Sequence, residues 1–145
     1  MIDTTNIEQA KKLIKTSNEK PVIVLAQDDN FNRKILEYGK FDILLSVERG
    51  NRQRTLRTID SGLNHVLAEI AAKNKVSIGI DMGEIRTLQK EEKALRLEKI
   101  KQNIKICRKA KTKLVLLGYK DEKDAFAFLL SLGASTKQAK EAISF

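Results

Sequence analysis

The sequence contains few of the residues that bind metal ions through nitrogen or sulfur. It has 1 cysteine and 1 histidine in 145 residues, which is too few for a standard zinc site within one chain. The single cysteine, Cys107, also excludes a disulfide within the chain. Because Cys107 falls among apolar residues at helical spacing, we expect an inert buried thiol, and no metal site or cofactor held by this chain.

Other absences narrow the fold and the location. No run of about 18 apolar residues could span a membrane, and the first five residues lack the basic-then-apolar pattern of a signal peptide. We therefore expect a soluble, cytoplasmic protein without a membrane partner. The 7 glycines are scattered, and no GxGxxG or GxxxxGK motif offers a loop for a nucleotide. With 1 proline and no Pro/Gly-rich linker, residues 1–145 are predicted to form a single domain.

Apolar and periodic segments alternate along the chain. Short apolar, β-branched runs at 22–26, 43–47, 76–80 and 114–118 predict buried strands. Helical periodicity is found at 7–15, 32–38, 63–73, 88–111 and 125–132. This alternation indicates an α/β fold with a parallel sheet covered by helices, either open or closed into a barrel. A full barrel needs about 250 residues, so we predict an incomplete or minimal TIM-barrel-like fold, with residues 142–145 starting one more strand.

Positive charge dominates the surface chemistry. The 28 Lys and Arg against 19 Asp and Glu give a net charge of +9, which favours a polyanionic partner such as RNA. Residues 86–113 hold 11 basic and 3 acidic residues, and so +8 of that charge. Lys101, Lys105 and Lys109 recur at i, i+4 and i+8 beside an apolar stripe. They are candidate phosphate contacts, although a solvated lysine face with no ligand would give the same pattern.

A second basic cluster follows the predicted strand at 43–47. It has four arginines and no acidic residue: Arg49, Arg52, Arg54 and Arg57. Guanidinium groups bind phosphate oxygens in a bidentate manner. An arginine-rich connection at the carboxyl end of a strand therefore predicts contact with structured RNA.

Acidic residues also follow the predicted strands, and they support an alternative function. Asp28, Asp29, Glu48 and Asp81 could converge on a divalent metal, as a metal-dependent phosphoesterase would require. Acidic residues in this position also commonly cap the next helix, and Asp29 or Asn30 is expected to do so before residue 31. A further alternative is a generic basic module that binds RNA or protein without a defined target.

Three segments stand out, namely 62–73 with the strand at 76–80, 31–37 leading into 41–44, and 131–145. Together they resemble ribonuclease P protein component 3, a family shared by archaea and eukaryotes. The most specific segment is 62–73, which contains His65 and is followed by the strand at 76–80. The Asn-Arg helix at 31–37 leading into 41–44, and the closing segment 131–145, are also similar to the family. The resemblance covers residues 22–145, and relatives have more strand-helix units, so an incomplete barrel is expected.

The resemblance implies a barrel-like fold derived from metal-dependent phosphoesterases but lacking their metal site. It further implies that the chain is a subunit of ribonuclease P, the endoribonuclease that removes the 5′ leader of precursor tRNA, with magnesium serving the catalytic RNA and no catalytic residue in this chain. The implied partners are ribonuclease P RNA, the small ribonuclease P subunit that pairs with component 3 and, indirectly, precursor tRNA. By position, Asn32, Arg33 and His65 match family residues expected to contact RNA or a partner. Relatives place an arginine soon after the strand at 76–80; here Arg86 comes later, and we include it among the expected contacts. For His65, a surface histidine without a role is the alternative.

Overall fold

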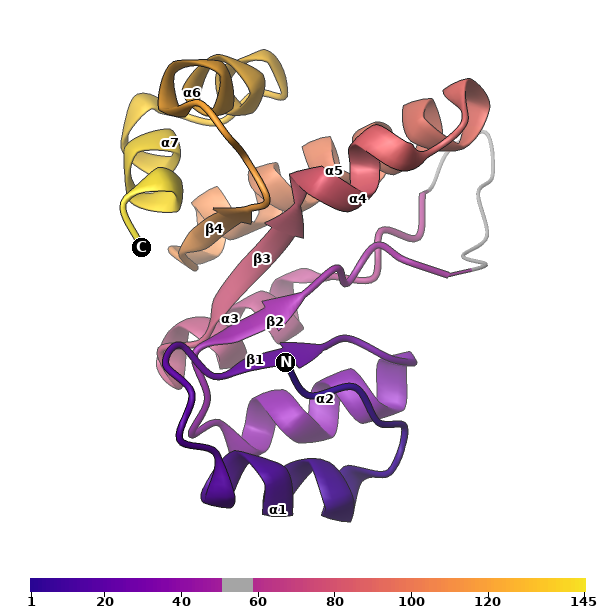
Figure 1. The fold of residues 1–145 in the computed structure, drawn as a ribbon, viewed down its shortest axis with the longest axis vertical. Coiled ribbons are helices and arrows are strands. Elements are labelled where there is room, and N and C mark those ends of the chain that lie inside the picture. The colour runs from indigo at the N-terminus through magenta and orange to yellow at the C-terminus, as the bar shows by residue number, and fades with distance from the viewer. Residues whose placement is uncertain (51–58) are drawn as a thin grey trace.

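The computed structural model describes residues 1–50 and 59–145 as a parallel sheet wrapped by helices (Figure 1). The strands are β1 (Ile23–Leu25), β2 (Ile43–Leu45), β3 (Ser77–Asp81) and β4 (Leu114–Leu117). The helices are α1 (Ile7–Thr16), α2 (Asp29–Tyr38), α3 (His65–Lys73), α4 (Met82–Thr87), α5 (Lys90–Ala110), α6 (Glu122–Ser131) and α7 (Thr136–Ile143). The predicted α/β class and the four predicted strands are confirmed.

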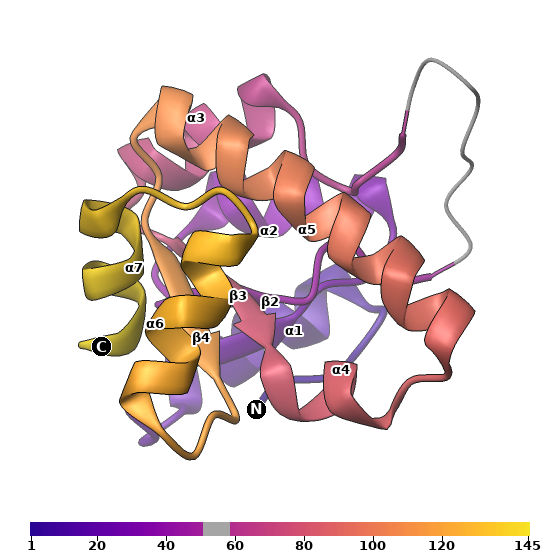
Figure 2. The ribbon, with the colours of Figure 1, turned by 90° about the horizontal axis from the view of Figure 1, so that it is seen from above.

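The strands lie in the order of the sequence, β1-β2-β3-β4, and every pair is parallel. Helices follow the outer side of the curved sheet: α1 and α2 lie by β1, α3 and α5 behind the centre, and α6 and α7 by β4 (Figures 1 and 2). This sequential order with outer helices is the arrangement of a TIM barrel that is open on one side. Ile2 adds a single parallel bridge to Val24 at the β1 edge.

The main core lies between the sheet and its helices. Val24, Leu44, Ile78 and Leu116 point from the sheet into this core and are buried. Because side chains alternate along a strand, the intervening residues point to the other, open side of the sheet. None of the described helices is long and apolar enough to cross a membrane.

The start of α2 and the end of α7 differ from what the sequence predicted. Asp28, rather than Asp29 or Asn30, caps α2, with its Oδ1 accepting the N–H of Phe31 at 2.7 Å. Residues 142 and 143 end α7 and do not form a strand. A capping box between Ser135 and Gln138 starts this helix, and Ala139 and Ala142 share its buried side. The mostly apolar segment 142–145 is therefore the last turn of a helix and its exposed end.

Candidate nucleic-acid interface

Two of the family-matched residues lie on neighbouring helices, α2 and α3, which pack against each other. The Nε of Arg33 donates to Glu37 at 2.9 Å, and Nε2 of His65 lies 2.8 Å from Oε1 of Glu69. Both basic side chains are more than half exposed. His65 is also the first residue of α3, where free backbone N–H groups and the helix dipole favour anions. Arg33 and His65 can therefore reach an external phosphate at this junction.

A hollow of about 410 Å³ lies beside this junction. It is lined by Asp29 and Arg33 of α2, residues 59–64, Leu67 of α3 and Gln102 of α5. Nε2 of Gln102 donates to the Ile59 carbonyl oxygen at 2.9 Å and to Oγ of Ser61 at 3.0 Å. Nδ2 of Asn103 donates to the Ser61 carbonyl oxygen at 3.0 Å. These hydrogen bonds connect the segment that leads into α3 with the middle of α5, and they hold α3 beside α5.

Asn32, the third family-matched residue, does not lie on the surface. Its side chain is 0% exposed. Its Oδ1 accepts the N–H of Gln27 at 2.8 Å, and its Nδ2 donates to the carbonyl oxygen of Gln27 at 3.2 Å. The expectation that Asn32 touches RNA does not fit this burial. Asn32 instead holds the turn between β1 and α2, and so positions Arg33.

Replacing Asn32 with alanine is expected to lower the free energy of unfolding by about 1–3 kcal/mol, because the part-buried N–H of Gln27 loses its acceptor. The measurement is urea denaturation followed by circular dichroism. Asn30→Ala is the matched control, since Asn30 is exposed on the same helix and should change stability by less than about 0.5 kcal/mol. Loss of RNA affinity in folded Asn32→Ala with no loss of stability would restore the direct-contact hypothesis.

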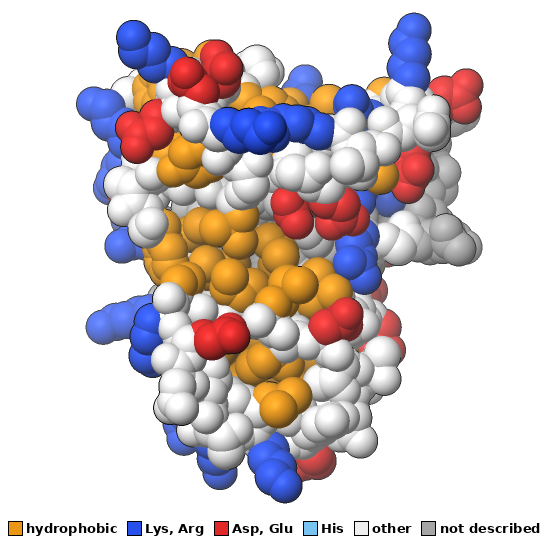
Figure 3. All heavy atoms as spheres, in the orientation of Figure 1, with side chains coloured by type: hydrophobic (Ala, Val, Ile, Leu, Met, Phe, Trp, Pro, Cys, Tyr) orange, Lys and Arg blue, Asp and Glu red, His pale blue; other side chains and the backbone are white. Residues whose placement is uncertain are grey.

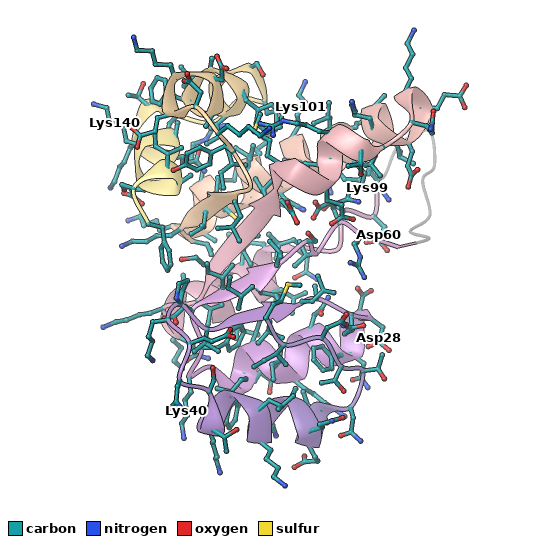
Figure 4. All side chains as sticks on the ribbon, viewed as in Figure 1. Asp28, Lys40, Asp60, Lys99, Lys101 and Lys140 are labelled. Carbon is teal, nitrogen blue, oxygen red and sulfur yellow. The ribbon has the colours of Figure 1, made fainter. Side chains whose placement is uncertain are left out.

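The long helix α5 carries the exposed lysine row that the spacing predicts. Lys101, Lys105 and Lys109 are exposed, while Ile100, Ile104 and Cys107 are buried against the sheet side. Figure 4 shows Lys101 on the outer side of α5 and Lys99 on the inner side. Burial raises the pKa of the Cys107 thiol to about 12, which agrees with the predicted inert thiol.

Two basic residues of this helix do not belong to the cationic surface. Arg96 and Lys99 are buried. Arg96 donates from Nη2 to Glu48 and from Nη1 to Glu84, both at 3.2 Å. Burial raises the pKa of Glu48, and the nearby Arg96 guanidinium opposes that rise. Part of the positive charge of the 86–113 segment is therefore buried and does not face solvent. The spacing of the basic residues in the sequence did not predict this burial.

Three of the four acidic residues proposed for a phosphoesterase site have structural roles in this arrangement. Asp28 caps α2 and Asp81 caps α4, where its Oδ1 accepts the N–H of Glu84 at 3.1 Å. Glu48 is paired with Arg96. Across residues 1–50 and 59–145, no three His, Cys, Asp or Glu side chains are grouped so that they could hold a metal ion. The geometry therefore gives the phosphoesterase alternative no support.

Of the remaining predicted arginines, the two that the structure describes lie near the carboxyl ends of the strands. Arg49 is exposed after β2, and Nη1 of Arg86 donates to the Gly118 carbonyl oxygen after β4 at 3.3 Å. Arg52, Arg54 and Arg57 lie outside the described residues. The structure thus places Arg33 and His65, each beside a glutamate, at the α2–α3 junction, a row of exposed lysines along α5, and single arginines at the strand ends. Gln102 and Asn103, which connect the first two, had no charge or motif to mark them in the sequence.

The curated proteins that this chain resembles in sequence share one name. Ribonuclease P protein component 3 of Methanococcus maripaludis strain C6 is 30% identical over 117 residues, which is 79% of this chain and 47% of that protein. The protein of the same name from Methanocaldococcus jannaschii is 27% identical over the same shares. A chain in a cryo-EM structure of archaeal ribonuclease P with mature tRNA superposes with a TM-score of 0.80 at 26% identity, covering 97% of this chain and 62% of that chain. No family model matches. The chain spans about half the length of the curated relatives it matches.

Proposed function

Because this chain belongs to the ribonuclease P protein component 3 family, we propose that it is a protein subunit of ribonuclease P that binds the RNA and supports cleavage of precursor tRNA to mature 5′ ends. The resemblance noted in the sequence is confirmed by these relatives. The observation that carries the proposal is the structural likeness to a chain of archaeal ribonuclease P over 97% of this chain.

In this proposal the chain acts through fixed cations and not through a catalytic group. Arg33 and His65 at the α2–α3 junction, and Lys101, Lys105 and Lys109 on α5, are exposed and can lie against phosphates. Neutralising phosphates lowers the repulsion between RNA segments that must approach each other. The RNA, with magnesium, is expected to be the catalyst. The small ribonuclease P subunit is the expected protein partner.

Reconstitution tests the proposal. Cleavage of precursor tRNA by the ribonuclease P RNA and the small subunit is measured at low magnesium, with and without this chain. We expect a faster rate and a lower magnesium requirement when the chain is present, because its cations replace part of the ionic screening. A lysine peptide of equal net charge is the control, and an equal effect of that peptide would favour the generic basic module.

The outcome that contradicts the proposal is an unchanged rate and magnesium requirement. The phosphoesterase alternative makes a different prediction, which the same preparations can test. Hydrolysis of a phosphate ester by the chain alone with manganese, abolished in Asp81→Asn, would favour that alternative.

A further inference from the structure

The three connections that lead from a helix into β2, β3 and β4 each hold an exposed lysine with left-handed backbone geometry. These lysines are Lys40 (φ 62°), Lys75 (φ 58°) and Lys111 (φ 61°). Glycine and asparagine adopt this geometry with less strain than lysine does. Because β2, β3 and β4 are parallel neighbours, the connections 39–42, 74–76 and 111–113 lie side by side at one edge of the sheet, the amino edge. Figure 4 shows Lys40 on this side of the molecule.

Hydrogen bonds between these connections and the neighbouring helices make the amino edge one connected surface. Nδ2 of Asn74 donates to the carbonyl oxygen of Leu36 at 2.6 Å. Oγ1 of Thr112 donates to the carbonyl oxygen of Ala68 at 2.7 Å. Gly39 packs closely on Asn74, since a Cβ at Gly39 would lie 3.2 Å from the Cβ of Asn74. The backbone that carries the lysines is therefore ordered before any ligand binds, which lowers the cost of binding.

Two adjoining hollows open at the amino edge, with volumes of about 450 and 410 Å³. They share Lys111 and Lys113, and Phe145 lines the larger one. Glu141, which is half-buried, is the acidic side chain among their described lining residues. In Figure 3, Lys and Arg side chains project along the left side, where Figure 1 places the amino ends of the strands. The basic side chains that line the hollows are all exposed: Lys75, Arg108, Lys111, Lys113 and Lys137.

The protein leaves most of this charge unneutralised. Within residues 1–50 and 59–145, Lys75, Lys111 and Lys113 form no ion pair. A cation just after a helix is favoured by the helix dipole, and this accounts for Lys75 after α3 and Lys111 after α5. It does not account for Lys113, and the dipole opposes Lys137, which lies in the first turn of α7. Stabilisation of the helices therefore explains only part of the cluster.

We propose that the amino edge, through Lys75, Lys111 and Lys113, binds the phosphate backbone of RNA. This extends the interface beyond the α5 lysine row, which ends at Lys109. The inference rests on the proposed function, because ribonuclease P RNA is the RNA meant.

The chemistry of the edge favours RNA over an acidic protein segment. A phosphate backbone carries one charge for each nucleotide, and ammonium groups bind it as point charges without reading the bases. Phe145 is 60% exposed in the same hollow as the three lysines. An unpaired base can stack on such a ring while the lysines bind its phosphates. The hollow thus offers both kinds of contact that a nucleotide makes.

An affinity measurement tests the inference. In one variant we combine Lys75→Asn, Lys111→Asn and Lys113→Gln; asparagine suits the left-handed positions, so the chain should stay folded, as circular dichroism checks. Affinity for ribonuclease P RNA should fall on the order of tenfold to a hundredfold near 0.1 M salt, and the salt slope by about 2–3. The matched control changes Lys12, Lys15 and Lys123 to glutamine. These lysines are exposed on α1 and α6, and their loss should weaken binding less.

A crosslinking experiment tests the location directly. Cys107 is buried and its pKa is raised to about 12, so an alkylating photo-crosslinker at neutral pH should react only with an introduced thiol. Lys113→Cys carrying the crosslinker should form a covalent adduct with ribonuclease P RNA on irradiation. Lys123→Cys, exposed at the start of α6 beyond the other end of β4, is the control and should give much less adduct.

The possible outcomes separate this inference from the proposed function. If the unchanged chain binds ribonuclease P RNA and stimulates cleavage, but the amino-edge variant binds equally well or position 113 gives no adduct, the inference fails alone. Equal losses in the two triple variants would also overturn it, as would a polyglutamate peptide that blocks the adduct as well as RNA of equal charge does. An unchanged chain that does not bind ribonuclease P RNA would overturn both proposals.

Discussion

Replacing Arg96 with methionine should lower the free energy of unfolding by about 3–5 kcal/mol at neutral pH, the usual cost of leaving a buried charge without its partner. Glu48 is 1% exposed and lies 3.2 Å from the Arg96 guanidinium. The second partner, Glu84, keeps contact with solvent, because its side chain is 29% exposed. The penalty therefore falls chiefly on Glu48. Urea denaturation of the two proteins measures it.

The loss should depend on pH in a defined direction. Burial already raises the pKa of Glu48 above its ordinary value, so the folded state holds this proton more tightly than the unfolded chain does. Such a group favours folding below the unfolded pKa, and its contribution is lost as pH rises through the folded pKa. Removing Arg96 removes the charge that opposes the rise. The difference between Arg96→Met and the unchanged chain should therefore be smaller at pH 5 than at pH 7.5.

Two further variants separate the buried charge from lost packing. Glu48→Gln combined with Arg96→Met removes both charges and should recover a large part of the lost stability. Arg33→Met breaks the exposed pair with Glu37 at 2.9 Å, and it should cost less than about 1 kcal/mol because water screens that pair. An Arg96→Met variant as stable as Arg33→Met would show that the buried pair contributes no specific stability.

Sequence periodicity predicted the strands because each is a short apolar run that parallel packing buries. It predicted the start of the last strand wrongly for a similar reason. Ala142, Ile143 and Phe145 are apolar residues close together, and only the capping box between Ser135 and Gln138 identifies the segment as a helix. The short helix α4 was also missed, since six residues are too few to show a helical period.

The candidate site was predicted in part. Exposure of Lys101, Lys105 and Lys109 followed from their helical spacing beside the apolar stripe. Burial of Arg96 depends on Glu48, which is 48 residues away in the sequence, so no local pattern could indicate it. Asn32 could not be assigned from the sequence either. Its match to the family marked it as a candidate contact, but the fold shows that it is buried and hydrogen-bonded to the backbone of Gln27, whereas Arg33 is exposed.

Changing Lys101, Lys105 and Lys109 together to glutamine should weaken binding to ribonuclease P RNA by on the order of tenfold to a hundredfold near 0.1 M salt. Glutamine keeps the helix propensity of lysine, so α5 should remain folded while losing three exposed charges. The slope of log affinity against log salt should fall by about 2–3, since each neutralised phosphate contributes roughly 0.7–0.9. Filter binding across a salt series measures both quantities.

The matched control removes the same number of charges elsewhere. Lys12, Lys15 and Lys140 are exposed on α1 and α7, and changing them to glutamine lowers the net charge equally. If the RNA lies along α5, this control should keep a salt slope close to that of the unchanged chain. Equal slopes for the two triple variants would mean that net charge, and not the lysine row, governs binding, and the row would then have no place in the interface. A difference between the slopes counts the phosphates that α5 itself neutralises.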